Sequence, residues 1–307
     1  MKRLSESMRV TVHSAGSTVP TSKHAWRGGK LGEVPRRFEV VTHKRWIAEL
    51  FGPLGARQNM GFDIDPETAL DTIWWAPGAW VASAHRAGIQ LPLLSCGPDW
   101  LTNVPMEYRG RRVQNKTIDE IFPGKTRPTF AKLPEVKHDG VPAQVYGECY
   151  LRDTLKQYNL PAETVWQLQE PVEFIHEARY WIAHREIVAA SMYKINNVIW
   201  GDPRWDEVQF DCLSSQEAMD ILARKVVRDV GQPPGWVLDI GMTEDGPLVI
   251  EANAAWSSGP YDGDPEGIFR AIVASHDFDQ RFPQWAWRHS PVFDKVRPLK
   301  LSQPVIS

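Results

Sequence analysis

Residues 236–254 read WVLDIGMTEDGPLVIEANA and predict two strands joined by a turn. Apolar residues run on both sides of Glu244-Asp245-Gly246, a group typical of the turn in a β-hairpin. We expect a three-residue turn with Gly246 in the left-handed region, which places Asp239 directly across from Glu251. The hairpin therefore brings two acidic side chains together.

The side chains of a strand alternate between its two faces, which predicts the neighbours of these acids. In the return strand, Val249, Glu251 and Asn253 should project from one face. Directly opposed residues have Cβ atoms about 5 Å apart, and like charges placed so are destabilising unless something offsets them. Carboxylates and an amide oxygen are hard ligands that suit magnesium, which usually also binds phosphate oxygens. We therefore predict a metal site on Asp239, Glu251 and Asn253 beside a nucleotide; the alternative is an acidic hairpin face in water.

Two other parts of the chain fit a nucleotide. The segment Gln169-Glu170-Pro171-Val172-Glu173-Phe174 joins two strand-like stretches, so its backbone could pair with an adenine edge while Glu177 reaches the ribose hydroxyls. Lys132, Arg179 and Lys194 fall on or beside predicted strands with largely apolar neighbours. Cations aimed into a cleft can bind phosphates, and arginine can do so with two hydrogen bonds. Taken singly, each feature is also compatible with an acidic connection or a surface charge.

The rest of the pattern indicates an α/β chain with a mostly antiparallel middle. Strands are predicted over 38–42, 90–94, 129–132, 143–146 and 164–168, with a second hairpin over 178–194. Helices are predicted over 44–51, over 73–85, over 214–230 with Ser214 and Glu217 as a capping box, and from Asp264-Pro265 onward.

Composition bounds the class of protein. A net charge of -3 over 307 residues gives no general attraction to nucleic acid or to an anionic membrane. The three cysteines are far apart and form no C-x-x-C pair, which argues against a disulfide framework or a structural zinc and fits a reducing cytoplasm. No apolar run reaches the roughly 18 residues that span a bilayer. We expect a cytoplasmic protein, with residues 1–32 as a loose arm.

Together these residues resemble the ATP-grasp superfamily, whose members clamp ATP between a central antiparallel subdomain and a C-terminal one. The strand around Lys132 looks like the one that carries the family's first phosphate lysine. Residues 169–174 look like its adenine hinge, and Glu177 looks like its ribose carboxylate. The three metal-site residues predicted above are similar to its magnesium ligands.

The stretch Glu173–Lys194 and the loop Trp256–Tyr261 look closest to the clade named for one arginine and two lysines. The resemblance assigns catalytic roles to Arg179, Lys132 and Lys194, and Lys137 is an alternative to Lys194. The ATP contacts that it implies are Lys132, Lys137, Gln169, Glu170, Pro171, Val172, Glu173, Glu177 and Lys194.

The resemblance also implies the fold, which is an α/β (α+β) ATP-grasp fold in three subdomains. After the arm, an N-terminal α/β subdomain would cover residues 33–125. A central antiparallel β-rich subdomain would cover 126–195, and a C-terminal α+β subdomain with the metal site would cover 196–307.

The implied activity is that of an ATP-dependent carboxylate–amine ligase, which forms an amide or peptide bond through an acylphosphate and releases ADP and phosphate. ATP and Mg²⁺, or Mn²⁺ in its place, would be required. The substrates would be a small-molecule or peptide carboxylate and an amine, with no nucleic-acid or membrane partner. Two alternatives remain: a phosphotransferase that stops at a phosphorylated product, and a non-catalytic module that binds a peptide or glycan on a tryptophan-rich surface.

Overall fold

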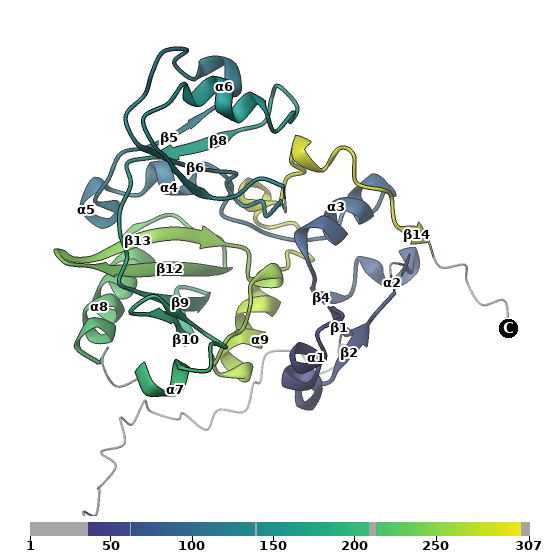
Figure 1. The fold of residues 1–307 in the computed structure, drawn as a ribbon. Coiled ribbons are helices and arrows are strands. Elements are labelled where there is room, and N and C mark those ends of the chain that lie inside the picture. Colours follow the sequence, from purple (N-terminus) through teal and green to yellow (C-terminus); the bar gives the residue numbers. More distant parts are fainter. Residues whose placement is uncertain (1–35, 62, 139, 209–212, 302–307) are drawn as a thin grey trace, which may run out of the picture. The chain divides into compact units, whose positions relative to one another are not determined.

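The computed structural model describes residues 36–61, 63–138, 140–208 and 213–301 (Figure 1). The arm predicted over residues 1–32 lies outside them. Across these described ranges, no helix is both long and apolar enough to cross a membrane. The elements combine helices with several sheets, as the predicted α/β class requires.

The first sheet of the described residues has three parallel strands in the order β2-β1-β4. Its strands are β1 (Phe38–Val41), β2 (Ala56–Asn59) and β4 (Ile73–Trp75). The segments between and after them are α1 (Arg45–Phe51), η1 (Gly52–Leu54), β3 (Asp63–Ile64), α2 (Pro66–Ala69) and α3 (Gly78–Arg86). The short strand β14 (Lys300–Leu301) pairs in parallel with β3. The strand over 38–42 and the helix over 44–51 are confirmed.

Two predictions in this region are wrong. Helical spacing was expected from Ile73, but the first three residues form β4 and the helix begins at Gly78. A strand was expected over 90–94, yet this segment makes only isolated bridges, from Leu93 to His276 and from Leu94 to Ala286. The segment includes Pro92, which has no backbone N–H to donate to a continuous ladder.

A four-stranded antiparallel sheet follows, in the order β5-β8-β6-β7. Its strands are β5 (Val113–Lys116), β6 (Thr129–Lys132), β7 (Gln144–Tyr146) and β8 (Trp166–Gln169). The short helices of this region are α4 (Trp100–Asn103), α5 (Met106–Arg109), η2 (Ile118–Glu120) and α6 (Leu151–Lys156). A core around Trp166 and Leu155 holds α6 on the sheet. The boundary predicted at 125/126 does not coincide with the start of this sheet, because β5 already belongs to it.

The largest sheet has five antiparallel strands in the order β11-β10-β9-β12-β13. They are β9 (His176–Ala183), β10 (Glu186–Ile195), β11 (Val198–Ile199), β12 (Gly235–Thr243) and β13 (Gly246–Asn253). Both predicted hairpins are confirmed, and the first turns at His184 and Arg185, which have φ values of 50° and 68°. The boundary predicted at 195/196 falls inside this sheet, because β9 pairs with β12.

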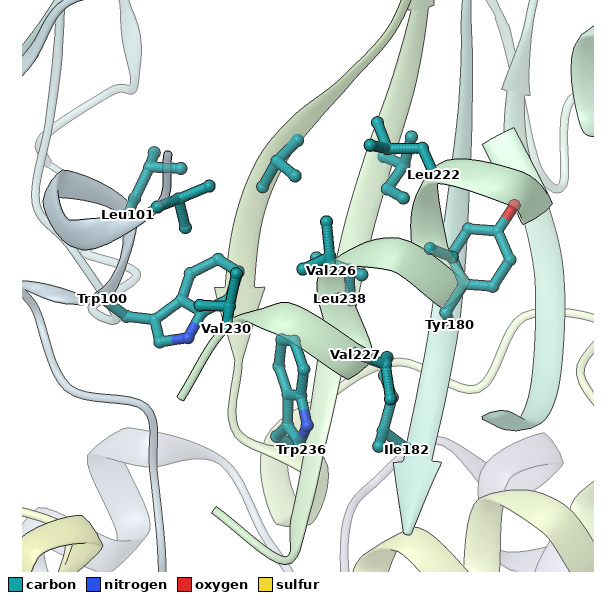
Figure 2. Packing of buried hydrophobic residues seen from close by; sticks show 14 of the residues in the cluster. Trp100, Leu101, Tyr180, Ile182, Leu222, Val226, Val227, Val230, Trp236 and Leu238 are labelled. Atoms are coloured by element: carbon teal, nitrogen blue, oxygen red, sulfur yellow. The ribbon is translucent and has the colours of Figure 1, made fainter. Parts of the chain in front are cut away.

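Two helices cover the opposite faces of the five-stranded sheet. The helix α8 (Leu213–Asp229) packs on the face that carries Tyr180, Trp236 and Leu238 (Figure 2). The helix α9 (Pro265–Ala274) packs on the other face, against Trp181 and Val237. The central strands β9 and β12 are therefore buried on both faces, which explains their largely apolar sequences.

Four remaining short elements connect or follow these. They are α7 (Trp205–Val208), η4 (Ala255–Ser257), η5 (Pro283–Trp285) and η6 (Pro291–Phe293). The α8 helix begins at Leu213, so Ser214 lies inside its first turn rather than at the predicted N-cap. Asp264 caps α9 as expected, because its carboxylate accepts a hydrogen bond of 2.7 Å from Gly267 N.

Gly267→Ala is expected to lower the free energy of unfolding. Alanine favours a helix over glycine by up to about 1 kcal/mol. At this position, however, a Cβ would lie 2.0 Å from Val188 O, a backbone atom of β10. Overpacking of this kind costs about 1–3 kcal/mol. Urea denaturation should show a net loss, whereas Gly78→Ala, whose Cβ would meet nothing within 4 Å, should show none. Equal stability of the two variants would contradict the tight packing of α9.

Candidate functional site

Three charged side chains occupy one row across the five-stranded sheet. Asp239 on β12 pairs in register with Glu251 on β13 on one side and with Arg179 on β9 on the other. The predicted opposition of the two acids is therefore confirmed. Directly opposed residues in a sheet present their side chains on the same face. The row lies on the α9 side of the sheet, because Arg179 and Trp181 are two residues apart on β9.

The hairpin reaches this register by a different route from the one predicted. The turn has two residues, Glu244 and Asp245, and Gly246 pairs with Thr243 at a φ of 128°. A β-bulge at Ile250 then shifts the pairing by one residue, so that Ile240 opposes Val249 while Asp239 opposes Glu251.

The bulge also overturns one prediction about the faces of β13. Val249 was expected to share a face with Glu251, but it is fully buried in the core beneath α8, on the opposite side of the sheet. The extra residue makes this possible, because it changes which face the following side chain meets.

The Asp239–Arg179 pair is the buried centre of the row. Arg179 Nε donates to Asp239 Oδ1 at 2.9 Å and Nη2 donates to Oδ2 at 2.8 Å, with side chains only 5% and 1% exposed. Burial raises the pKa of the Asp239 carboxyl, and the guanidinium opposes this shift. A bidentate ion pair of this kind fixes the orientation of both side chains.

Glu251 joins this centre to the neighbouring four-stranded sheet. Its carboxylate forms an ion pair with Nζ of Lys132, the last residue of β6. Burial acts to raise the pKa of Glu251, but Lys132 and Asn253 outweigh it, and the net shift is downward. Asn253 Nδ2 lies 2.8 Å from Glu251 Oε1 and 2.9 Å from Asp239 Oδ2. One small amide group thus sits between two carboxylate oxygens.

Lys194 and Glu177 form a third ion pair. They are directly paired residues of β10 and β9, and Lys194 Nζ lies 2.9 Å from Glu177 Oε1. The same ammonium donates to Phe174 O at 2.8 Å, so it holds the predicted hinge segment against the sheet. The Phe174 ring covers Gly241, where a Cβ would lie 2.2 Å from the ring. Lys194, Glu177 and the end of the hinge therefore meet in one place.

The hinge residues divide into two groups. Gln169 is buried, with its side-chain oxygen accepting from Arg111, and Glu170 pairs with Arg112 at 2.7 Å. Pro171 and Glu173 are exposed and Val172 is half-buried. In the described ranges, the backbone N–H groups of Val172 and Glu173 have no hydrogen-bond partner. The side chain of Gln169 is thus committed to the protein, and the segment 172–173 has the open backbone that pairing with a base edge requires.

Lys137 is not brought to the cluster. It is exposed in the loop after β6, and it makes no ion pair with any residue of the described ranges. Of the two lysines that could accompany Lys132, the geometry favours Lys194.

Sequence reasoning missed Arg111, which is 3% exposed. Its guanidinium donates to Val249 O at 2.8 Å and to Ile250 O at 3.0 Å, which are the carbonyls at the bulge. Burial, with Arg109 nearby, lowers the pKa of Arg111 to about 10. The side chain thus fixes the bulge that orients Glu251. Nothing in its sequence position indicates this role, because Arg111 lies in the connecting segment Arg109-Gly110-Arg111-Arg112, where it is one of three arginines.

Two tyrosines were also missed. Tyr193 and Tyr261 stack with ring centroids 5.1 Å apart, and the Arg179 guanidinium lies 5.1 Å from the Tyr261 ring and 5.6 Å from the Tyr193 ring. Tyr261 has a φ of 48° in the small-residue loop after β13. The aromatic pair therefore shields one side of the buried arginine.

The donor set fits a hard divalent cation better than a soft one. The described residues hold no group of three His, Cys, Asp or Glu side chains placed to bind a metal. The candidate set instead combines two carboxylates with one amide, and oxygen ligands of this kind suit magnesium. The Asn253 nitrogen now lies between the two carboxylates. A rotation of its terminal torsion would place the amide oxygen there, because the two ends of the amide differ only in O and N.

Comparison with known proteins identifies the family. Residues 69–272 match the model of the family described as ATP-grasp domain, R2K clade family 3. The match covers the four-stranded sheet, the five-stranded sheet and nearly all of α9. A search of the curated proteins gave no match.

Solved structures similar to the chain include three ATP-grasp proteins or ligases. A RimK domain ATP-grasp protein from Sphaerobacter thermophilus has 15% identity and a TM-score of 0.44, over 78% of this chain and 98% of that one. An N5-carboxyaminoimidazole synthetase from Staphylococcus aureus in complex with ADP has 8% identity and a TM-score of 0.46, over 80% and 79%. A D-alanine–D-alanine ligase from Bacillus anthracis in complex with ATP has 13% identity and a TM-score of 0.39, over 78% and 96%.

Proposed function

The chain belongs to the ATP-grasp domains of R2K clade family 3, and on this premise we propose that it is an ATP-dependent carboxylate–amine ligase. It forms an amide or peptide bond through an acylphosphate intermediate and releases ADP and phosphate. Its substrates are a carboxylate and an amine, as small molecules or as parts of a peptide.

The observation that carries the proposal is the Lys132–Glu251 pair, which joins the four-stranded sheet to the metal-site hairpin. Around it, Arg179–Asp239 and Lys194–Glu177 repeat the same pairing of one cation with one carboxylate. A magnesium nucleotide also carries both charges. Carboxylates favour the metal ion and the basic side chains favour phosphate oxygens, so the cluster has a partner for each part of the ligand.

Asp239, Glu251 and Asn253 would hold the magnesium ion, with manganese as a substitute. When bound, the ion would neutralise phosphate charge. Lys132 and Lys194 would bind phosphate oxygens as point charges. Arg179 would hold Asp239 in place, since both oxygens of that carboxylate already accept hydrogen bonds from it. The adenine edge would pair with the backbone of Val172 and Glu173, and Glu177 would bind the ribose hydroxyls.

The reaction balances in two steps. The substrate carboxylate attacks the γ-phosphorus, the bond from phosphorus to the bridging oxygen breaks, and ADP leaves with the electron pair. The amine nitrogen then attacks the acyl carbon of the acylphosphate, phosphate leaves, and the nitrogen loses a proton. Catalysis of this kind depends on positioning and on neutralising charge, and the ion pairs described above supply fixed cations for both.

Calorimetric titration of ATP into the full-length chain, with magnesium chloride and with EDTA, tests the nucleotide site. We expect binding with magnesium and much weaker binding with EDTA. A second assay would follow ADP release with pooled acids and pooled amines, alone and together, with mass spectrometry of the products. The ligase reaction requires ADP release and an amide mass only when both pools are present.

Two outcomes would overturn the proposal at different levels. Absence of ATP binding both with magnesium and with EDTA would rule out the proposed nucleotide site. A phosphorylated acid that accumulates when amine is present, without any amide, would identify a phosphotransferase instead of a ligase.

A further inference from the structure

A cavity of about 380 Å³ lies beside the charged cluster and takes no part in the contacts described above. Its walls come from residues 95–105, the end of α8 and the segment 284–288, with Glu135 between them. A smaller hollow shares Gly97, Pro98, Trp100 and Glu135 with it and also touches Lys132 and Glu251. The cavity therefore adjoins the phosphate and metal side of the candidate site, and Glu135 stands at the junction.

Two tryptophans give the cavity an aromatic wall. Trp100 donates its indole N–H to Gly231 O at 2.9 Å and packs against Trp236 with ring centroids 5.1 Å apart. Trp285 lines the same cavity. A volume of this size with apolar walls and a few polar groups is typical of a small-molecule site.

Four charged side chains line the cavity, and two of them are already paired. Asp229 accepts hydrogen bonds from Tyr108 and from its neighbour Arg228, and Asp99 accepts one of 2.7 Å from Asn115. These carboxylates are therefore engaged with the protein.

The other two, Glu135 and Arg288, have no ion-pair partner within the ranges that the structure describes. The Glu135 carboxylate is held in place by Gly97 N at 2.8 Å and by Ser95 Oγ at 3.4 Å. Its backbone has a φ of 56°, a left-handed conformation that is uncommon for a residue with a side chain and clusters at functional sites. The cavity thus offers one fixed carboxylate and one guanidinium group of opposite charge.

We propose that this cavity binds the amine substrate as a zwitterionic amino acid or short peptide, with its ammonium at Glu135 and its carboxylate at Arg288. This inference rests on the proposed function, because it names the amine that the ligase would use. The place of Glu135 between the cavity and Lys132 puts the amino nitrogen on the side where the acylphosphate would form.

The electrostatics of Glu135 support this position. Glu135 is exposed as a residue, yet burial of its carboxyl group raises the pKa of that group to about 7. Gly97, Ser95 and Lys132 act in the opposite direction, while Glu251 adds to the rise. A carboxylate in this position can accept the proton that an ammonium must lose before its nitrogen attacks.

The test uses saturation-transfer NMR on the full-length chain with the twenty common amino acids and glycylglycine as probes. Each probe that binds is compared with its analogues that lack the ammonium or the carboxylate; for L-phenylalanine these are 3-phenylpropionate and phenethylamine. We expect at least one amino acid or glycylglycine to bind, and each analogue to bind about tenfold or more weakly, since a hydrogen bond to a charged group is lost.

Variants then assign the two ends. For each probe that binds, Glu135→Gln should weaken binding of the probe and of its analogue without a carboxylate about tenfold or more, and leave its analogue without an ammonium unchanged. Arg288→Gln should weaken binding of the probe and of its analogue without an ammonium, and leave its analogue without a carboxylate unchanged. Glu107→Gln, which changes an exposed carboxylate outside the cavity, should alter none of them. Thermal melting of each variant separates lost binding from lost folding.

Failure of this inference can be told apart from failure of the proposed function, because ATP binding is measured separately. Magnesium-dependent ATP binding without binding of any probe would overturn the amino-acid cavity and leave the ligase proposal standing. Binding that Glu135→Gln and Arg288→Gln leave unchanged would also overturn it.

Discussion

Glu251→Gln is expected to lower ATP turnover by about 10²–10³-fold or more, the scale on which loss of one charge-stabilising group acts in an active site. The substitution keeps the size of the side chain and removes its charge. Glu251 lies across from Asp239, contacts the Asn253 amide and pairs with Lys132, so it takes part in both the metal set and the phosphate set. Steady-state ADP release measures the effect, and calorimetry should show that ATP binding no longer depends on magnesium.

The matched control for this variant is Glu148→Gln. Glu148 also pairs with a lysine, Lys125 at 3.0 Å, but both side chains are exposed and far from the hairpin in the sequence. Its turnover should equal that of the wild type. Turnover of Glu251→Gln within about threefold of the control would exclude Glu251 from the metal site, because a lost ligand of this kind should cost far more.

Arg179→Met is expected to lower the free energy of unfolding by about 3–5 kcal/mol, the usual cost of leaving a buried charge without its partner. The side chains of Arg179 and Asp239 are 5% and 1% exposed, so water cannot replace the guanidinium. Urea denaturation at pH 7 measures the loss. The double variant Arg179→Met with Asp239→Asn should recover much of it, because no unpaired charge remains. The control is Arg228→Met, which breaks an exposed bidentate pair with Asp229. A loss of unfolding free energy in Arg179→Met no larger than in this control would contradict the expected cost of the buried charge.

The loss should also depend on pH. Burial raises the pKa of Asp239 in the folded protein, and without Arg179 nothing comparable opposes that rise. Between the unfolded and folded pKa values the folded variant binds more protons than the unfolded chain, so its stability falls as pH increases through that window. The deficit against wild type should therefore be larger at pH 8 than at pH 5. A deficit that grows on acidification would mean that another group dominates.

The two hairpins and the helices that follow them could be predicted from the sequence alone, because strand alternation, turn residues and helical spacing are local properties of the chain. The opposition of Asp239 to Glu251 was also predicted, but through a three-residue turn, whereas the structure reaches it through a two-residue turn and a bulge. The resemblance carried by Lys132, Arg179 and Lys194 likewise led to the family that the comparison identifies. Their ion-pair partners were not predicted: Asp239 and Glu251 were assigned to a metal ion, and Glu177 was assigned to ribose.

Only the tertiary structure decided how these side chains are held. The bulge at Ile250 exists because the two-residue turn shifts the register and Arg111, from a distant segment, binds the carbonyls at the bulge. Pairing across the predicted subdomain limits is also long-range, because β5 pairs with β8 and β9 pairs with β12. The Lys132–Glu251 pair likewise joins residues 119 positions apart. Local patterns fix the direction in which a side chain points, whereas long-range packing fixes which residues it contacts. The candidate site depends on contacts of this second kind.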